Sequence, residues 1–271
     1  MVKLWENYRY LILRRLTQVG LLVLYFGGNV WGWTVLRGNL SSSKIFNTIP
    51  VSDPYAALQM LAAGATLATD LLIGVAVTTI FYLLIGGRAF CSWVCPINMV
   101  TDAANYTRRV LDIKRVQGNK QPASRNIRYW ALGLSLVISA VMGLTAFEFI
   151  SPISMVHRGI VFGLGFGWAA IVVIFLFDLL ILKNGWCGHV CPLGGFYSLL
   201  GKFSLIRVHH NEANCTLCMK CKVVCPEQQV LGMVGKESLP VLSGECTNCA
   251  RCIEVCDDDA LGFSIKSLVK K

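Results

Sequence analysis

The chain alternates between four long apolar segments and more polar connections. The apolar segments cover residues 17–36, 65–86, 129–150 and 160–182, and each is long enough to cross the hydrocarbon core of a bilayer as a helix. Their glycines and terminal aromatic residues, such as Trp31, Trp33 and Trp130, are typical of membrane helices. The pattern predicts an α-helical integral membrane protein with four transmembrane helices arranged as two tandem hairpins.

The positive charges predict the orientation of these helices. Hydrophobic residues make up 55% of the chain and charged residues only 15%, which is unusual for a soluble protein. Of the 25 Lys and Arg residues, 22 lie before residue 17, between residues 87 and 128, or after residue 182. Because positively charged loops remain in the cytoplasm, we expect a multi-pass membrane protein with both termini cytoplasmic. The net charge of +10 then reflects topology and attraction to anionic lipid rather than nucleic-acid binding.

Twelve cysteines fall into two patterns, with none left over. Eight form two C-x-x-C-x-x-C-x-x-x-C runs, here named the first run (residues 215–225) and the second run (residues 246–256). Four thiolates hold a [4Fe–4S] cluster, and such a run supplies three of them from one loop. Structural zinc normally shows separated C-x-x-C pairs, and disulfides suit small secreted domains. The doubled run therefore indicates two iron–sulfur clusters.

Residues 208–265 resemble a bacterial-type two-cluster ferredoxin, a small α+β module. In that arrangement the fourth cysteine of each run binds the other cluster. The resemblance implies two ligand sets, cluster 1 with Cys215, Cys218, Cys221 and Cys256, and cluster 2 with Cys246, Cys249, Cys252 and Cys225.

An acidic triplet follows the second run. Asp257 stands where such ferredoxins usually carry proline, and Asp258 and Asp259 follow it. Negative charge near a cluster lowers its potential, so we expect a comparatively low potential for the adjacent cluster. The alternative is a solvated acidic turn.

The other four cysteines form a C-x-x-x-C-P motif that occurs twice. Cys91 and Cys95 precede Pro96, and Cys187 and Cys191 precede Pro192, each motif following a predicted helical hairpin. This pattern predicts a tandem duplication that brings the four thiols together, with a short interfacial helix starting at each proline. A third metal or redox site, a redox-active dithiol pair, a docking surface and buried structural thiols all remain open. His189 in the second motif is a further candidate ligand, although Trp93 occupies its equivalent in the first.

The expected domains are a cytoplasmic arm (1–16), a four-helix membrane domain with both C-x-x-x-C-P motifs (17–205) and a 2[4Fe–4S] ferredoxin domain (206–271). This combination resembles the NapH family over essentially the whole chain. NapH proteins are membrane ferredoxin-type subunits of the periplasmic nitrate reductase electron-transfer system. The resemblance implies a quinol dehydrogenase component of the bacterial inner membrane that is active only in complex. It would pass electrons from the quinol pool to a NapG-type periplasmic iron–sulfur protein and on to nitrate reductase.

Quinol oxidation also releases protons, and ionisable residues at membrane depth are candidates to accept them. The candidates are Asp70, Glu148, His157 and Asp178. An alternative function is a membrane polyferredoxin that acts as a metal (copper) reductase or assembly factor, with the C-x-x-x-C-P thiols handling the metal.

Overall fold

The computed structural model describes residues 2–111, 124–163, 165 and 167–265. It divides into two compact units. The cysteine-rich unit comprises residues 1–18, 80–94 and 197–271, and the helical unit comprises residues 19–79 and 95–196. The cysteine-rich unit thus joins the ferredoxin-like residues to two segments from elsewhere in the chain, whereas the domain boundaries expected from the sequence stay a prediction.

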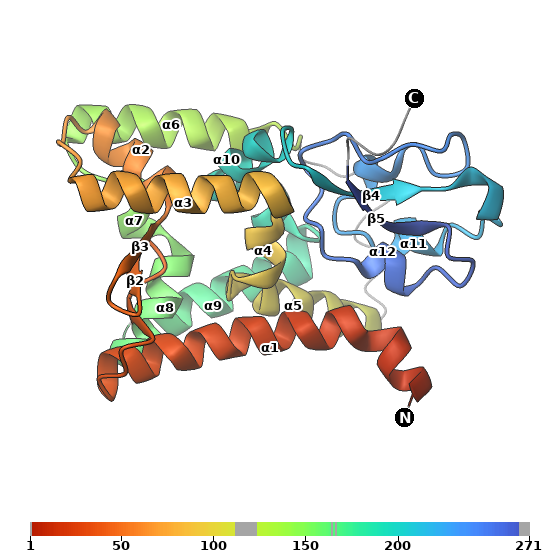
Figure 1. Cartoon of the computed structure of the whole chain (residues 1–271), viewed down its shortest axis with the longest axis horizontal. Helices are drawn as coiled ribbons and strands as arrows, with labels where there is room; N and C mark the ends of the chain where they lie inside the picture. Colours follow the sequence, from red (N-terminus) through yellow and green to blue (C-terminus); the bar gives the residue numbers. More distant parts are fainter. Residues whose placement is uncertain (1, 112–123, 164, 166, 266–271) are drawn as a thin grey trace. The chain divides into compact units, whose positions relative to one another are not determined.

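Helices dominate the secondary structure (Figure 1). The α-helices are α1 (Val2–Val30), α2 (Pro54–Ala62), α3 (Thr69–Ile85), α4 (Ala89–Trp93), α5 (Ile97–Val110), α6 (Ile127–Met142), α7 (Ala146–Ile150), α8 (Pro152–Phe162), α9 (Gly167–Leu176), α10 (Pro192–Gly201), α11 (Lys220–Val224) and α12 (Arg251–Glu254). Two π-helical turns, η1 (Phe177–Ile181) and η2 (Trp186–Val190), and two 3₁₀ turns, η3 (Glu212–Asn214) and η4 (Gln228–Leu231), complete the helical elements of the described residues. The strands are β1 (Leu36–Gly38), β2 (Ser42–Ile45), β3 (Ile49–Ser52), β4 (Ile206–His210) and β5 (Leu261–Ile265).

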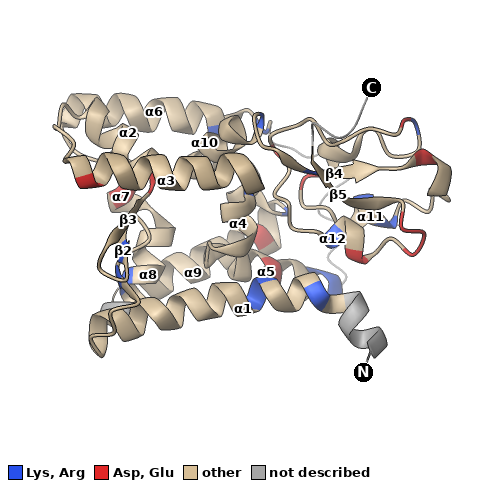
Figure 2. Ribbon diagram, viewed as in Figure 1, with Lys and Arg blue, Asp and Glu red and all other residues tan. Residues whose placement is uncertain are grey.

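Three of the four apolar segments form helices that are shorter than expected, whereas the first lies in α1, which begins before residue 17 and ends at Val30 rather than at residue 36. Within the described residues one helical stretch, Tyr8–Val30, is long and apolar enough to cross a membrane, and Thr69–Ile85, Ile127–Met142 and Gly167–Ile181 are shorter apolar helices. Figure 2 shows almost no charge along α3, α6 and α9, in which Asp70 and Arg128 are the only charged residues. Chain hydropathy therefore identified these helices, while four complete spans stay a prediction.

Glycines account for two of the differences in helix boundaries. The expected 129–150 segment is not one helix, because α6 ends at Gly143 in the left-handed conformation (φ 65°) and the chain resumes as α7. In the 160–182 segment, α8 ends before Gly163 (φ 106°) and α9 begins at Gly167, with residues 164 and 166 of that prediction outside the described residues. Both positions favour glycine because a Cβ is strained there.

The connection between the first two apolar segments contains structure that the sequence did not predict. Strands β1, β2 and β3 form an antiparallel sheet in chain order. Helix α2 follows it, with Asp53 as N-cap accepting a hydrogen bond from the Tyr55 amide and Pro54 at the first helical position. By contrast, α5 and α10 begin where the two C-P pairs predicted new helices.

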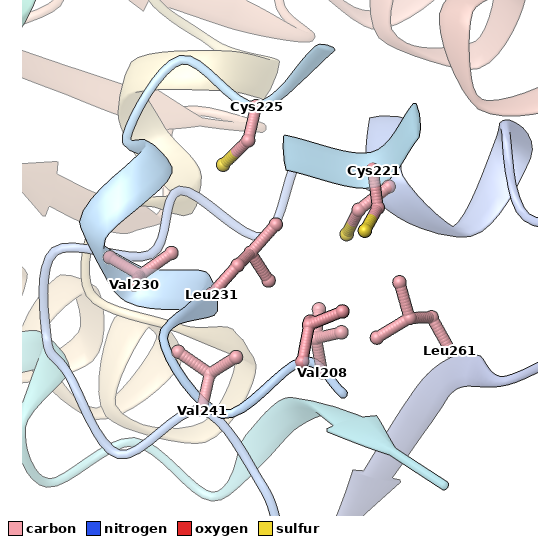
Figure 3. Packing of buried hydrophobic residues seen from close by; sticks show 9 residues of the cluster. Val208, Cys221, Cys225, Val230, Leu231, Val241 and Leu261 are labelled. Atoms are coloured by element: carbon pink, nitrogen blue, oxygen red, sulfur yellow. The ribbon is translucent and has the colours of Figure 1, made fainter. Parts of the chain in front are cut away.

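In the cysteine-rich unit, β4 and β5 pair antiparallel beside α11 and α12 (Figure 1). Apolar side chains of this unit surround the thiols of Cys221, Cys225 and Cys252. Figure 3 shows Cys221 and Cys225 among Val208, Leu231 and Leu261. This small core positions the candidate site.

Candidate iron–sulfur site

The two cysteine runs share one backbone conformation. Leu217 (φ 61°) and Met219 (φ 58°) are left-handed in the first run, and Asn248 (φ 46°) and Ala250 (φ 59°) occupy the same places in the second. Non-glycine residues adopt this conformation at a cost of about 1–2 kcal/mol each, and such strain concentrates at functional loops. A short helix, α11 or α12, follows each loop and carries the third cysteine. The sequence repeat is therefore also a structural repeat.

The thiols expected to hold cluster 2 line one cavity. Three come from the second run and Cys225 comes from the first, so the cavity connects the two runs. The residues that line it are Cys225, Cys246, Cys249, Cys252, Val208, Glu227, Val230, Leu231, Thr247 and Ala250. Four sulfur donors around a largely apolar space fit a [4Fe–4S] cluster, which takes one thiolate on each iron.

The residues expected to hold cluster 1 also lie near one another. Burial raises the pKa of the Cys221 thiol, and Cys221 lies close enough to the thiols of Cys215, Cys218 and Cys256 that their negative charges raise this pKa further. Cys218 is exposed, whereas Cys221 is buried. This second group of thiols thus lies closer to solvent than the group around the cavity.

No three His, Cys, Asp or Glu side chains in the described part of the chain converge as closely as a single metal ion requires. A zinc ion draws thiolates to about 2.3 Å, whereas an iron–sulfur cube spreads them over four iron atoms.

Burial disfavours ionisation of Cys225, Cys246 and Cys252 in the absence of a bound cation. It raises the pKa of Cys246 to about 11, and it also raises the pKa of Cys225 and Cys252, with neighbouring thiols adding to the effect. Thiolates this close together repel one another in a poorly hydrated space, and bound iron relieves that repulsion. Once bound, the clusters supply one-electron carriers to this unit.

The acidic triplet contacts the first run. The Asp257 carboxylate pairs with Lys220 at 2.6 Å, and Asp258 accepts a hydrogen bond from the Thr216 hydroxyl at 2.5 Å. Both carboxylates therefore contact the loop of the first run, although the Lys220–Asp257 pair is exposed to solvent, so the solvated acidic turn stays an alternative. Lys220 offsets part of the Asp257 charge, and the expected low potential of cluster 1 stays a prediction.

Helix α4, which carries Cys91, is hydrogen-bonded to the loop of the second run. The Ser92 hydroxyl donates to the Thr247 carbonyl (2.7 Å), and the Trp93 indole donates to the Asn248 carbonyl (3.0 Å). The Asn248 amide in turn donates to the carbonyls of Ile85 (2.8 Å) and Ile206 (3.0 Å). The first C-x-x-x-C-P motif is thereby joined to the cluster 2 loop, a contact that no sequence pattern indicated.

A buried ion pair and helix α1 reinforce this arrangement. Arg88 pairs with Glu227 at 2.6 Å and donates to the Glu245 carbonyl at 3.0 Å. On α1, the Thr17 hydroxyl donates to the Trp93 carbonyl (3.1 Å), and Gln18 donates to the Ser92 carbonyl (3.1 Å). Residues from three distant parts of the sequence thus hold α4 in place.

The second C-x-x-x-C-P motif lies in the helical unit. Cys187 on η2 contacts the Thr101 hydroxyl at 3.4 Å, and Cys95, Cys191 and Asp178 are within electrostatic range of it. Three of the four motif cysteines, drawn from both halves of the duplication, therefore lie near one another. Cys91 belongs to the cysteine-rich unit, so the approach of all four thiols stays a prediction.

The four quinol candidates have different surroundings. Asp70 is exposed in the first turn of α3 and pairs with Lys44 at 3.1 Å. Glu148 accepts hydrogen bonds from the hydroxyls of Ser41 (2.7 Å) and Ser154 (2.9 Å). Both carboxylates are therefore already engaged.

His157 and Asp178 are buried and incompletely hydrogen-bonded. His157 is 1% exposed and meets Tyr25 edge to face at 4.8 Å, and its Nε2 has no hydrogen-bond partner among the described residues. One carboxylate oxygen of Asp178 accepts from the Trp186 amide at 3.0 Å, and the other has no such partner in the described part of the chain. Buried polar atoms are normally paired, so these two merit functional tests.

Comparison with known proteins agrees with this geometry. A family model described as a 4Fe-4S binding domain matches residues 67–114 and again 163–209, which contain the two C-x-x-x-C-P motifs. A second model, a 4Fe-4S dicluster domain, matches residues 207–257 and so covers both cysteine runs. No solved structure matches the chain.

Two curated relatives are ferredoxin-type proteins NapH. The chain is 43% identical to NapH of Escherichia coli over 97% of its length and 91% of that protein, and 44% identical to NapH of Haemophilus influenzae over 97% and 92%. It is also 43% identical to the methylamine utilization ferredoxin-type protein MauN of Methylorubrum extorquens, over 89% of the chain and 84% of that protein. The chain is thus an iron–sulfur electron-transfer protein, and it belongs to the family of NapH ferredoxin-type proteins.

Proposed function

We propose that this chain is the membrane component of a quinol dehydrogenase that passes electrons from the quinol pool to a NapG-type iron–sulfur protein and on to periplasmic nitrate reductase. The observation that carries the proposal is the match to NapH proteins over 97% of the chain, which includes both cysteine patterns. Four membrane helices and cytoplasmic termini are part of it, supported by the apolar helices and by the distribution of Lys and Arg.

In this function the cysteine-rich unit binds two [4Fe–4S] clusters with the ligand sets expected from the ferredoxin resemblance. The shared cavity of Cys225, Cys246, Cys249 and Cys252 supports the assignment of cluster 2. Hydrogen bonds from Ser92 and Trp93 to the cluster 2 loop support cluster 2 as the cluster that exchanges electrons with the first C-x-x-x-C-P motif.

Quinol oxidation requires a group that accepts protons, and we assign this role to Asp178. It is fully buried, carries a carboxylate oxygen without a partner among the described residues, and lies near Cys187. Asp178→Asn should slow cluster reduction by a quinol analogue at least tenfold, whereas Asp70→Asn, at the exposed pair with Lys44, should change it less than twofold. Reduction by dithionite should stay complete in both variants, which shows that the clusters are intact. Equal quinol rates in the two variants would remove Asp178 from the mechanism.

A periplasmic acceptor is separated from a cytoplasmic ferredoxin module by about 30 Å of hydrocarbon. Either quinol gives electrons directly to the acceptor at the outer face, or a partner cofactor bridges the membrane. Rapid mixing of the reduced chain with an oxidised NapG-type protein distinguishes these routes. Electron transfer in the absence of quinone requires a series of closely spaced redox centres between the ferredoxin module and the acceptor.

The central test is anaerobic redox titration of the purified protein. A quinol analogue should reduce the clusters, detected by loss of visible absorbance and by electron paramagnetic resonance (EPR). Clusters that stay oxidised with quinol, also when the partner is present, while added Cu²⁺ is reduced would instead support the metal reductase. Because identity to MauN is as high as to NapH, the same assay with and without a NapG-type partner tests the acceptor.

The four C-x-x-x-C-P cysteines are proposed as a third iron–sulfur site. The family model that matches both motif regions supports this assignment. Iron analysis should give about twelve atoms per chain with a third cluster and about eight without it, at four per cluster. Cys187→Ser should lower the count only in the first case, and Ser42→Ala, at an exposed position, provides a control for iron lost during purification.

A further inference from the structure

Arg207, at the start of β4, is a buried cation that has no carboxylate partner among the described residues. Its side chain is 3% exposed. Within the described part of the chain, its guanidinium donates to four backbone carbonyls, those of Gly201 (2.5 Å), Val241 (2.8 Å), Ser204 (3.1 Å) and Ser243 (3.5 Å). Among the described residues no Asp or Glu forms an ion pair with it. Carbonyl oxygens satisfy its hydrogen bonds but do not neutralise its charge.

Arg88 in the same unit shows what a neutralised guanidinium looks like. It is 1% exposed and pairs with Glu227 at 2.6 Å, where both side chains are almost fully buried. A buried charge is normally tolerated only with such a partner. The lack of a carboxylate beside Arg207 among the described residues therefore indicates that another negative group lies nearby when the cofactors are bound.

The surroundings of Arg207 identify that group. Val208, the next residue, lines the cavity that contains the four thiols of cluster 2. Ser243, whose carbonyl Arg207 reaches, precedes Cys246 by three residues, and the guanidinium is within electrostatic range of the Cys246 sulfur. Arg207 therefore lies beside this cavity without lining it.

A [4Fe–4S] cluster with four thiolates carries a net negative charge, which increases by one when it accepts an electron. A fixed positive charge beside it in a poorly hydrated core favours the reduced form. We propose that Arg207 is the charge partner of cluster 2 and raises its reduction potential above that of cluster 1. This inference rests on the ligand assignment in the proposed function.

The surroundings of cluster 1 have the opposite sign. The acidic triplet follows Cys256, and Asp257 and Asp258 contact the loop of the first run. An electron shared between the clusters should therefore reside mainly on cluster 2, the cluster whose loop is hydrogen-bonded to α4.

The experiment is a potentiometric titration of the full chain, followed by EPR. Arg207→Gln should shift one cluster signal to more negative potential, while Arg207→Lys, which keeps the charge, should leave it near the wild-type value. Lys202→Gln, at an exposed position nearby in sequence, should shift neither signal. Asp257→Asn should move the other signal to more positive potential.

Each outcome bears on the proposal. Loss of one cluster in the glutamine variant but not in the lysine variant also supports a requirement for positive charge. Equal shifts or equal cluster losses in both Arg207 variants would mean that the carbonyl contacts alone matter, which would overturn the proposal. An unchanged potential in Arg207→Gln would also overturn it. So would a shift in Arg207→Gln of the same EPR signal that Asp257→Asn moves. Iron content of the wild-type protein tests the clusters separately, because fewer than about eight atoms would contradict the proposed function itself.

Discussion

At the scale of single residues, burial decides which ion pairs matter. Arg88 and Glu227 are 1% and 3% exposed, whereas Lys44 and Asp70 are 49% and 66% exposed at a similar N–O separation. A surface pair contributes roughly 0–1 kcal/mol. Removal of one partner from a buried pair costs about 3–5 kcal/mol, because the other charge remains buried.

We therefore predict that Arg88→Met lowers the free energy of unfolding of the cysteine-rich unit by about 3–5 kcal/mol. Asp70→Asn should change unfolding by less than about 1 kcal/mol. Denaturant titration monitored by loss of cluster absorbance measures both. The double variant Arg88→Met with Glu227→Gln should recover much of the loss, and failure to do so would assign the effect to packing instead.

His157 predicts a pH dependence of stability. Burial, assisted by the neighbouring Arg158 charge, lowers the pKa of His157 to about 4 from its ordinary value of 6.5. The unfolded chain then binds more protons than the folded chain between these two values. The stabilising effect of a neutral His157 is complete above pH 6.5 and is lost as the pH falls from 6.5 to 4.

Thermal unfolding in detergent between pH 4 and 8 measures this effect, worth at most a few kcal/mol at about 1.4 kcal/mol per pKa unit. His157→Gln should flatten the dependence in this range. His209→Gln, at a partly exposed position, serves as the matched control. An unchanged pH profile in the His157 variant would show that other groups dominate.

At the scale of elements, three glycines allow backbones to touch within the cysteine-rich unit. A Cβ on Gly87 would lie 2.2 Å from the Tyr197 carbonyl, one on Gly201 would lie 2.5 Å from the Gly244 carbonyl, and one on Gly244 would lie 2.1 Å from the Ser198 carbonyl. These contacts join the segment before α4, the end of α10 and the loop before the second run. The sequence shows the glycines but not their partners.

Gly244→Ala should lower the free energy of unfolding by about 1–3 kcal/mol, because backbone atoms rather than a flexible side chain must move. Gly133→Ala, in α6 with open space around the new Cβ, should instead be neutral or stabilise by up to about 1 kcal/mol. Unfolding of the two variants in the same detergent compares them. Equal effects would indicate that backbone contact is not what requires glycine at position 244.

At the scale of the whole molecule, the charge distribution predicts topology. With 22 of 25 Lys and Arg residues in the arm, the 87–128 loop and the part after residue 182, both termini should be cytoplasmic. A C-terminal green fluorescent protein fusion should be fluorescent, and an alkaline phosphatase fusion after residue 52 should be active. Active alkaline phosphatase at the C-terminus would invert the proposed orientation. Part of the charge, in residues 112–123 and 266–271, lies outside the described residues.

The sequence by itself determined the chemistry, since cysteine type and spacing are local properties. It indicated two iron–sulfur ligand sets, two C-x-x-x-C-P motifs and the apolar helices. The number of cysteines and the length of an apolar segment can be counted directly from the sequence. It missed the β1–β3 sheet and the helix breaks at Gly143 and Gly163, which depend on local backbone geometry.

Only the tertiary structure showed which groups meet. The attachment of α4 to the cluster 2 loop, the burial of Arg88 against Glu227 and the bonds of Arg207 to backbone carbonyls join residues that lie 34 to 157 positions apart. Sequence cannot reveal such contacts, because the cost of burying a charge depends on what the fold places beside it. The twelve cysteines thus identify an electron carrier, and the surrounding fold decides how its clusters differ.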